Sequence, residues 1–163
     1  MVRKMMLTVA VAMLAAPAFA SAQSTITATA TVGQSAVVSG AGDLAFGTLL
    51  TASDNVIAAD GGAVTRTLDY NHDVDVTFAN VPTALTSAGA ADLPISLMCA
   101  AQLGGVWSTP VPCSFTTPIE LDVGASMTQA ILGFGGTILG ADVATAAAGA
   151  YTGSFDIVIE ARS

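Results

Sequence analysis

The side chains that most often carry out catalysis are scarce in this chain of 163 residues. His72 is the only histidine, so a serine or cysteine triad would have to use it as the base. No Gly-x-Ser-x-Gly turn is present to carry a nucleophile. We therefore interpret His72 as a turn residue, and we expect no catalytic site and no cofactor.

Two pairs of carboxylates, Glu120 with Asp122 and Asp156 with Glu160, are of the residue types that glycosidases use. Each pair occupies alternate positions of a run whose other positions are apolar, which is the pattern of a strand with one solvated face. Nothing in the sequence around them suggests a platform of aromatic residues for a sugar. We interpret both pairs as surface residues, and a secreted hydrolase is the least favoured function.

One acidic run copies the alternating oxygen ligands at the start of a calcium-binding loop. Its members are Asp69, Asn71, Asp73 and Asp75. The match then ends, because Val74 stands where the helix-loop-helix motif requires glycine and Asn80 stands where it requires glutamate. We keep the run as a weak metal candidate and expect no bound metal. The competing interpretation is a polar strand face or a hairpin turn.

The glycines of Gly133-Phe134-Gly135-Gly136 do not form a phosphate-binding loop, because they lie within a strand pattern and no helix follows. Glycines at such positions mark a bulge or the close approach of another segment. We therefore expect close packing against this strand.

Cys99 and Cys113 are the only cysteines. Both lie in the part of the chain expected to be exported, where the compartment is oxidising. We predict a disulfide between them, which would stabilise the fold by about 2–3 kcal/mol. A metal pair would need further His or Cys partners, and a redox pair would need Cys-x-x-Cys spacing. Between the cysteines, Trp107 is either an anchor covering the edge of the domain or an exposed contact residue.

The N-terminal segment has the parts of a secretory signal peptide. Arg3 and Lys4 begin it, residues 5–18 are almost wholly apolar, and small residues follow. We predict cleavage after Ala20 or Ala22, so that residues 1–22 are removed and residues 23–163 form a single domain. The apolar run is shorter than the roughly 20 residues that span a bilayer, which disfavours an uncleaved anchor. We expect no membrane span after cleavage.

The net charge of the chain excludes nucleic acid as a partner. Cleavage after Ala22 would leave Arg66 and Arg162 as the only basic residues against all 12 acids, a net charge of −10. Such a chain would be repelled by phosphates. Because 53% of the residues are hydrophobic and 10% are charged, the composition favours a secreted β protein over a disordered chain.

Alternation of apolar and polar residues dominates the chain beyond residue 22. The clearest case is residues 25–32, in which threonines occupy one face of a predicted strand. Residues 64–78 alternate in the same way and form either one long strand or a hairpin turning at Asn71-His72. Further strands are predicted at residues 95–102, 113–123, 131–139 and 151–161, and the only helix candidates are residues 84–91 and 141–148.

These elements predict an all-β domain of about seven to nine short strands. Many short strands joined by turns, with little helix, favour an antiparallel two-sheet β-sandwich over a barrel. The sequence contains no internal repeat of fixed period, which argues against a solenoid or a propeller.

Four short motifs resemble those of secreted bacterial pilin-like proteins. They are Ala28-Thr29-Ala30-Thr31-Val32, Asp43-Leu44-Ala45-Phe46-Gly47-Thr48, Asn71-His72-Asp73-Val74-Asp75-Val76-Thr77-Phe78 and Ala148-Gly149-Ala150-Tyr151-Thr152-Gly153-Ser154-Phe155-Asp156-Ile157-Val158-Ile159. Their order after a signal peptide is similar to that of a bacterial surface-protein family of unknown function. It is also similar to that of the spore coat protein U-like subunits of archaic chaperone-usher pili. The resemblance covers most of the chain after residue 22.

The resemblance implies an immunoglobulin-like, pilin-like β-sandwich without enzymatic activity, exported to the periplasm, the cell surface or the medium. Such pilins lack one strand, which the N-terminal strand of the next subunit supplies. The residues that match this donor role are Ile26, Ala28, Ala30 and Val32. The implied partners are further copies or related subunits, with a periplasmic chaperone and an usher.

We therefore expect a structural subunit of a cell-surface or fimbria-like assembly. The alternative is a monomeric secreted module that binds carbohydrate or calcium. Whether residues 25–32 complete their own sandwich or that of a neighbour stays open at this point.

Overall fold

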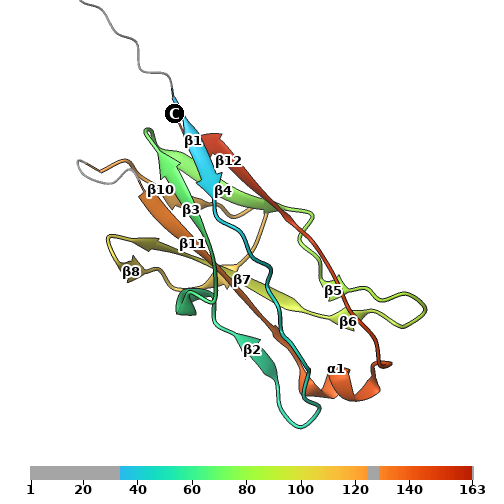
Figure 1. Ribbon diagram of the computed structural model, residues 1–163. Helices are drawn as coiled ribbons and strands as arrows, with labels where there is room; N and C mark the ends of the chain where they lie inside the picture. The colour runs from blue at the N-terminus through green and yellow to red at the C-terminus, as the bar shows by residue number, and fades with distance from the viewer. Residues whose placement is uncertain (1–33, 125–128, 163) are drawn as a thin grey trace, which may run out of the picture. The chain divides into compact units, whose positions relative to one another are not determined.

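The computed structural model describes residues 34–124 and 129–162, which form an antiparallel β-sandwich with very little helix (Figure 1). The chain divides into two units, residues 1–32 and 33–163, and the described residues belong to the second. The strands are β1 (Ala36–Ser39), β2 (Asn55–Ile57), β3 (Val64–Tyr70), β4 (Val74–Ala79), β5 (Ala84–Leu85), β6 (Leu93–Pro94), β7 (Ser96–Leu103), β8 (Val106–Trp107), β9 (Val111–Pro112), β10 (Ile119–Leu121), β11 (Gln129–Ile138) and β12 (Asp156–Ala161). The helical elements are the 3-10 turn η1 (Ala59–Gly61) and the helix α1 (Gly140–Thr145).

Two sheets form the layers of the sandwich. Sheet A has the strand order β1-β3-β11-β7-β8, with β2 also on β11 and β9 on β7, and sheet B has the order β10-β4-β12. Neighbouring strands pair antiparallel in both sheets. The predicted all-β antiparallel sandwich is therefore confirmed. The described residues contain 12 strands, whereas seven to nine were predicted. The number is larger because four of the strands are only two residues long.

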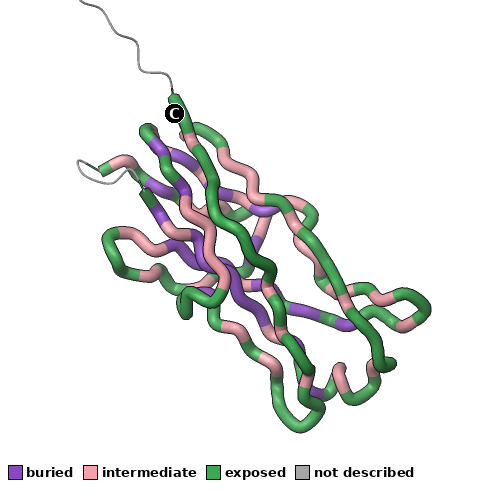
Figure 2. Tube along the Cα trace, in the orientation of Figure 1, coloured by how far each residue is buried: buried purple, intermediate pink, exposed green. Residues whose placement is uncertain are grey.

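The core lies between the sheets and follows the period-two alternation. In β4 the side chains of Val74, Val76 and Phe78 are buried, whereas the residues between them are partly exposed. Buried residues are concentrated on the central strands of both sheets (Figure 2). Full burial of one such side chain stabilises a fold by about 1.5–3 kcal/mol, so this alternation is a main source of stability.

The topology predicted for residues 64–78 was wrong. β3 pairs with β1 and β11 in sheet A, whereas β4 pairs with β10 and β12 in sheet B. The chain therefore changes sheets at residues 71–73 and forms neither a hairpin nor one long strand. The connection keeps even-numbered positions inward on both sides, so that Tyr70 and Val74 are both buried. The residues of the core were thus correctly predicted although their sheet was not.

Several other elements differ from the sequence-based prediction. Residues 84–91 contain β5 and a turn instead of a helix, because a segment without an apolar stripe gains more from pairing with β6. The second helix candidate is partly correct, since α1 covers its first residues. Of the strand predicted at residues 113–123, only the three residues of β10 form a strand. β12 begins five residues later than predicted, at Asp156.

One strand was not predicted, and two predicted segments cannot be compared with the structure. β1 was not predicted, because its sequence Ala36-Val37-Val38-Ser39 has no clear alternation. The predicted signal peptide and the predicted strand at residues 25–32 lie outside the described residues.

Gly133 and Gly135 allow other segments to lie directly on the outer face of β11. A Cβ atom at Gly133 would lie 2.7 Å from Cζ3 of Trp107, and it would also meet the carbonyl oxygen of Ala59 in η1. The close packing predicted for these glycines is therefore confirmed. Trp107 is partly buried against this strand, which supports its interpretation as an anchor.

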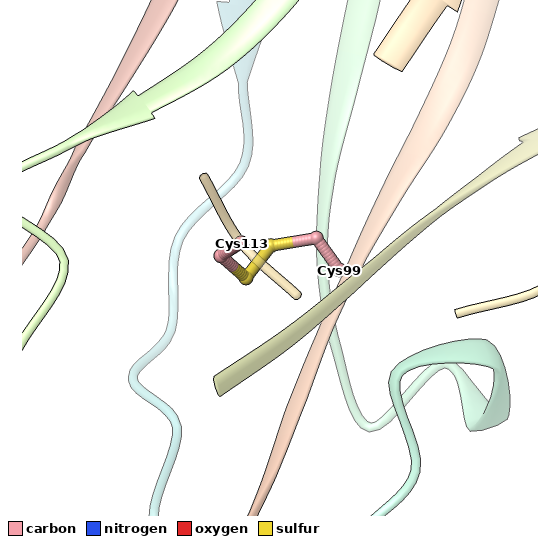
Figure 3. The surroundings of a disulfide bond; sticks show 2 residues. All are labelled: Cys99 and Cys113. Atoms are coloured by element: carbon pink, nitrogen blue, oxygen red, sulfur yellow. A yellow bond between two sulfur atoms is a disulfide. The ribbon is translucent and has the colours of Figure 1, made fainter. Parts of the chain in front are cut away.

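The predicted disulfide joins Cys99 in β7 to Cys113, just after β9 (Figure 3). The two Cα atoms are 5.2 Å apart, and both cysteines are buried. The bond therefore fixes the β7–β9 region to the core of the sandwich.

Candidate functional site

The predicted metal candidates are not brought together by the fold. Asp69 lies on sheet A, where its Oδ1 accepts a hydrogen bond from Nε2 of Gln129 at 2.8 Å. Asp73 lies at the end of the connection between the sheets, and Asp75 lies in β4 of sheet B. Across residues 34–124 and 129–162, no group of three or more His, Cys, Asp or Glu side chains is arranged to hold a metal ion.

His72 lies at the connection between the two sheets. Its Nδ1 atom is 3.0 Å from Oδ1 of Asn71, and that oxygen also accepts a hydrogen bond from the backbone N–H of Ser35 at 2.7 Å. These contacts fix a turn, which agrees with the interpretation of His72 as a turn residue.

Carboxylates gather around Arg162 at the C-terminal end of β12. The guanidinium lies 3.0 Å from Glu120 and also forms an ion pair with Asp122. It lies 3.6 Å from Asp75 and 4.0 Å from Asp73. The side chains of Glu120 and Asp122 are 68% and 77% exposed, so they belong to a solvated strand face, as their alternation predicted.

The strand register explains this concentration of negative charge. Asp75 in β4 is directly opposite Glu120 in β10 and also opposite Glu160 in β12. Like charges at directly opposite positions destabilise a sheet. Arg162, one residue beyond β12, partly offsets this repulsion.

Tyr70 is buried beside the same acidic face, and its hydroxyl donates a long hydrogen bond of 3.5 Å to the carbonyl oxygen of Asp122. Burial, and secondly the negative charge of Asp73, raise the pKa of the Tyr70 phenol above its ordinary value. The phenol therefore stays neutral at physiological pH and serves as a core residue with one polar end.

A groove of about 1370 Å³ runs along one side of the sandwich. One wall is residues 42–49, which follow β1, and the other is residues 146–157, which lead into β12. In Figure 1 these two wall segments run toward the α1 end of the domain. The floor consists of apolar side chains, among them Val64, Leu93, Ile95, Leu97, Phe134 and Ile138.

The floor of the groove is part of the hydrophobic core itself. Phe134 and Phe155 line the groove with their ring centroids 5.6 Å apart. Phe78 packs edge-on against both rings, and it is only 1% exposed. A ligand in the groove would therefore cover the core directly.

The two walls of the groove differ in their backbone hydrogen bonds. In the wall at residues 146–157, the backbone of Thr152 exchanges two hydrogen bonds of 2.9 Å with that of Thr86. Among the described residues, no hydrogen bond is made by the backbone of residues 43–49. β12 is the edge strand of sheet B, and it pairs only with β4. The groove thus lies between a wall segment without backbone hydrogen bonds and a wall that leads into the open edge of β12, an arrangement that suits an added β-strand.

Three charged residues line the groove, namely Asp43, Arg66 and Asp156. Asp156 accepts a hydrogen bond from Nδ2 of Asn80 at 2.7 Å. Arg66 is the one cationic side chain of the lining.

The chain matches no protein-family model and no curated protein. No helix within the described part of the chain has the length and apolar character needed to cross a membrane. The function is therefore inferred from the geometry of the groove and from the sequence outside the described residues.

The groove was not predicted from the sequence. One signal for it was present, because Arg66 occupies an even-numbered position in the inward row of β3, where an arginine is unusual. The four residues that match the donor role, from Ile26 to Val32, lie outside the described residues.

Proposed function

We propose that this protein is a non-enzymatic, exported structural subunit of a cell-surface or fimbria-like assembly, and that its groove receives the N-terminal strand of another copy. The observation that carries the proposal is the apolar slot between residues 43–49 and the edge of β12. Most of its floor residues are themselves at most 8% exposed, so the apolar surface that it leaves open to water belongs to partly buried residues such as Leu44, Phe46 and Phe155. An added strand would cover these side chains and could pair with residues 43–49 and with the open edge of β12.

The N-terminal segment has the composition that such a slot requires. Residues 25–32 carry no charge and alternate between threonine and apolar residues. In an extended strand, the side chains of Ile26, Ala28, Ala30 and Val32 would all face the floor. Threonine on the other face suits a solvent-exposed strand.

Other features are consistent with an exported subunit. The signal-like N-terminus would direct the chain across the inner membrane, and the disulfide suits an oxidising compartment. A groove exposed before assembly would need protection, so a periplasmic chaperone and an usher are the proposed partners.

Paired substitutions on the two faces of the N-terminal segment test the proposal. Ile26→Asp would place a carboxylate against the apolar floor, whereas Thr27→Asp would place it toward solvent. Burying an unpaired charge costs several kcal/mol, so Ile26→Asp should abolish assembly and Thr27→Asp should preserve it. The readout is the molar mass of the purified mature protein, measured by light scattering at a series of concentrations.

Equal assembly of the two variants would contradict the proposal. So would a full-length protein that is a stable monomer at every concentration, because its strand would then complete its own sandwich.

A further inference from the structure

Arg66 occupies a position on β3 at which the strand pattern places core residues. Its cross-strand partner on β11 is Leu132, which is fully buried. Side chains directly opposite each other on neighbouring strands lie on the same face of the sheet. The side chain of Arg66 is therefore directed toward the inside of the sandwich, where it lines the groove.

The guanidinium of Arg66 ties one wall of the groove to β3. Its Nη2 donates a hydrogen bond to the carbonyl oxygen of Gly42 at 2.6 Å, and its Nη1 donates to that of Thr65 at 2.9 Å. Gly40, with φ of +106°, lies against the stem of the side chain, since a Cβ there would be 3.6 Å from Cδ of Arg66. The turn that leads from β1 into the wall is thus held by this one side chain.

Arg66 forms no ion pair among the described residues, although the carboxylates of Asp43 and Asp156 line the same groove. All ion pairs among the described residues involve Arg162, and none involves Arg66. The two hydrogen bonds use two of the five N–H donors of the guanidinium. The remaining donors depend on water as long as the groove is open.

Closure of the groove would bury apolar side chains of its wall. Wall residues Leu44 and Phe46 are apolar and already pack against the core, so further closure would remove more apolar surface from water. No backbone hydrogen bond among the described residues holds this wall away from the floor. Closure would, however, take an unpaired guanidinium out of water, which is strongly unfavourable.

We propose that Arg66 is a positioning residue that keeps the groove open for strand entry. Its hydrogen bond to Gly42 fixes the wall, and its charge opposes closure. The identity of the entering strand rests on the function proposed above, whereas the open state of the groove does not.

The test compares Arg66→Met, Arg66→Lys and Arg162→Met in the full mature chain. Every protein also carries Ile26→Asp, so that an N-terminal strand does not occupy the groove. Two probes are used: Nile red, an uncharged dye that fluoresces on apolar surfaces, and a synthetic peptide of residues 23–33. Thermal melting of each variant is recorded in parallel.

Arg66→Met should reduce binding of both probes roughly tenfold, because apparent affinity falls with the fraction of open protein. Its melting temperature should be unchanged or higher, since closure buries apolar surface. Arg66→Lys keeps the charge but loses the paired guanidinium donors, so it should bind both probes more weakly than the parent and more tightly than Arg66→Met. Arg162→Met, the matched loss of an arginine outside the groove, should leave binding of both probes unchanged.

Binding of both probes to Arg66→Met at the parent level would overturn the role of Arg66. If Arg66→Met does not fold, Arg66→Gln replaces it, and parent-level binding by that variant would overturn the role equally. If no protein in the set binds the peptide but Nile red still falls with Arg66→Met, the role of Arg66 stands and the proposed strand addition fails.

Discussion

Arg162 illustrates how single charges are used in this protein. Five acidic side chains on or beside the outer face of sheet B surround this one arginine, namely Asp73, Asp75, Glu120, Asp122 and Glu160. The guanidinium is 25% exposed, so its attraction to each carboxylate is only partly screened by water. Its main effect is to reduce repulsion among the carboxylates rather than to form one strong pair.

Replacing Arg162 by methionine should therefore lower the free energy of unfolding by about 1 kcal/mol at low salt. The loss should shrink at about 1 M salt, where the Debye length falls to about 3 Å. Urea denaturation at the two salt concentrations measures it. Glu120→Gln, which removes one carboxylate from the same cluster, is the control and should be neutral or stabilising. A larger loss from Glu120→Gln than from Arg162→Met would contradict this account.

Residue-scale prediction from the sequence succeeded where the information was local. The inward residues of β3 and β4 follow from alternation alone, and the disulfide follows from there being only two cysteines. The contacts of Arg162 and Arg66 could not be predicted in this way. They depend on which strands are neighbours, and the sequence pattern of a strand does not specify its partners.

At the scale of elements, β11 organises sheet A. It pairs with β3 on one side and β7 on the other, and its glycines accept η1 and Trp107 on the outer face. The strand therefore carries packing on both faces, with Leu132 and Phe134 in the core. A side chain added at Gly133 or Gly135 would have no space on the outer face.

Gly133→Ala should destabilise the fold by about 1–3 kcal/mol, the usual cost of overpacking. The added Cβ would meet the carbonyl oxygen of Ala59 and would lie 2.7 Å and 2.8 Å from two ring carbons of Trp107, so both η1 and the ring must move outward. Because Trp107 is the only tryptophan, its fluorescence should shift to longer wavelength.

Gly124→Ala is the matched control, because no atom of residues 34–124 and 129–162 lies within 4 Å of a Cβ at that position. It should change stability by less than about 0.5 kcal/mol. Equal effects of the two substitutions would show that Trp107 does not pack on β11 as described.

The connection between β3 and β4 marks the limit of element-scale prediction. A hairpin and a change of sheet both keep even-numbered residues inward, so the alternation of residues 64–78 is the same for each. The wall at residues 43–49 is a second case, because an extended segment without a partner has no sequence signature that distinguishes it from a strand. Both features were decided by tertiary packing.

At the scale of the whole molecule, the apolar groove and the N-terminal segment are complementary in polarity. The described domain has an apolar groove that leads to the open edge of β12, and the sequence before the domain contains an uncharged segment of alternating apolar residues. One copy would supply the strand that another copy lacks. Repetition of this exchange would give a head-to-tail assembly.

Deletion of residues 24–32 tests this central claim most directly. The mature protein and the deletion variant are compared by light scattering, the variant with and without a peptide of residues 23–33. The account predicts molar masses of many copies for the intact protein. It predicts a single copy for the variant, which should bind one peptide and be stabilised by about 2.7 kcal/mol at peptide concentrations about a hundredfold above the dissociation constant. An intact protein that remains a single copy at every concentration, together with a deletion variant that is unfolded and not rescued by the peptide, would contradict the account.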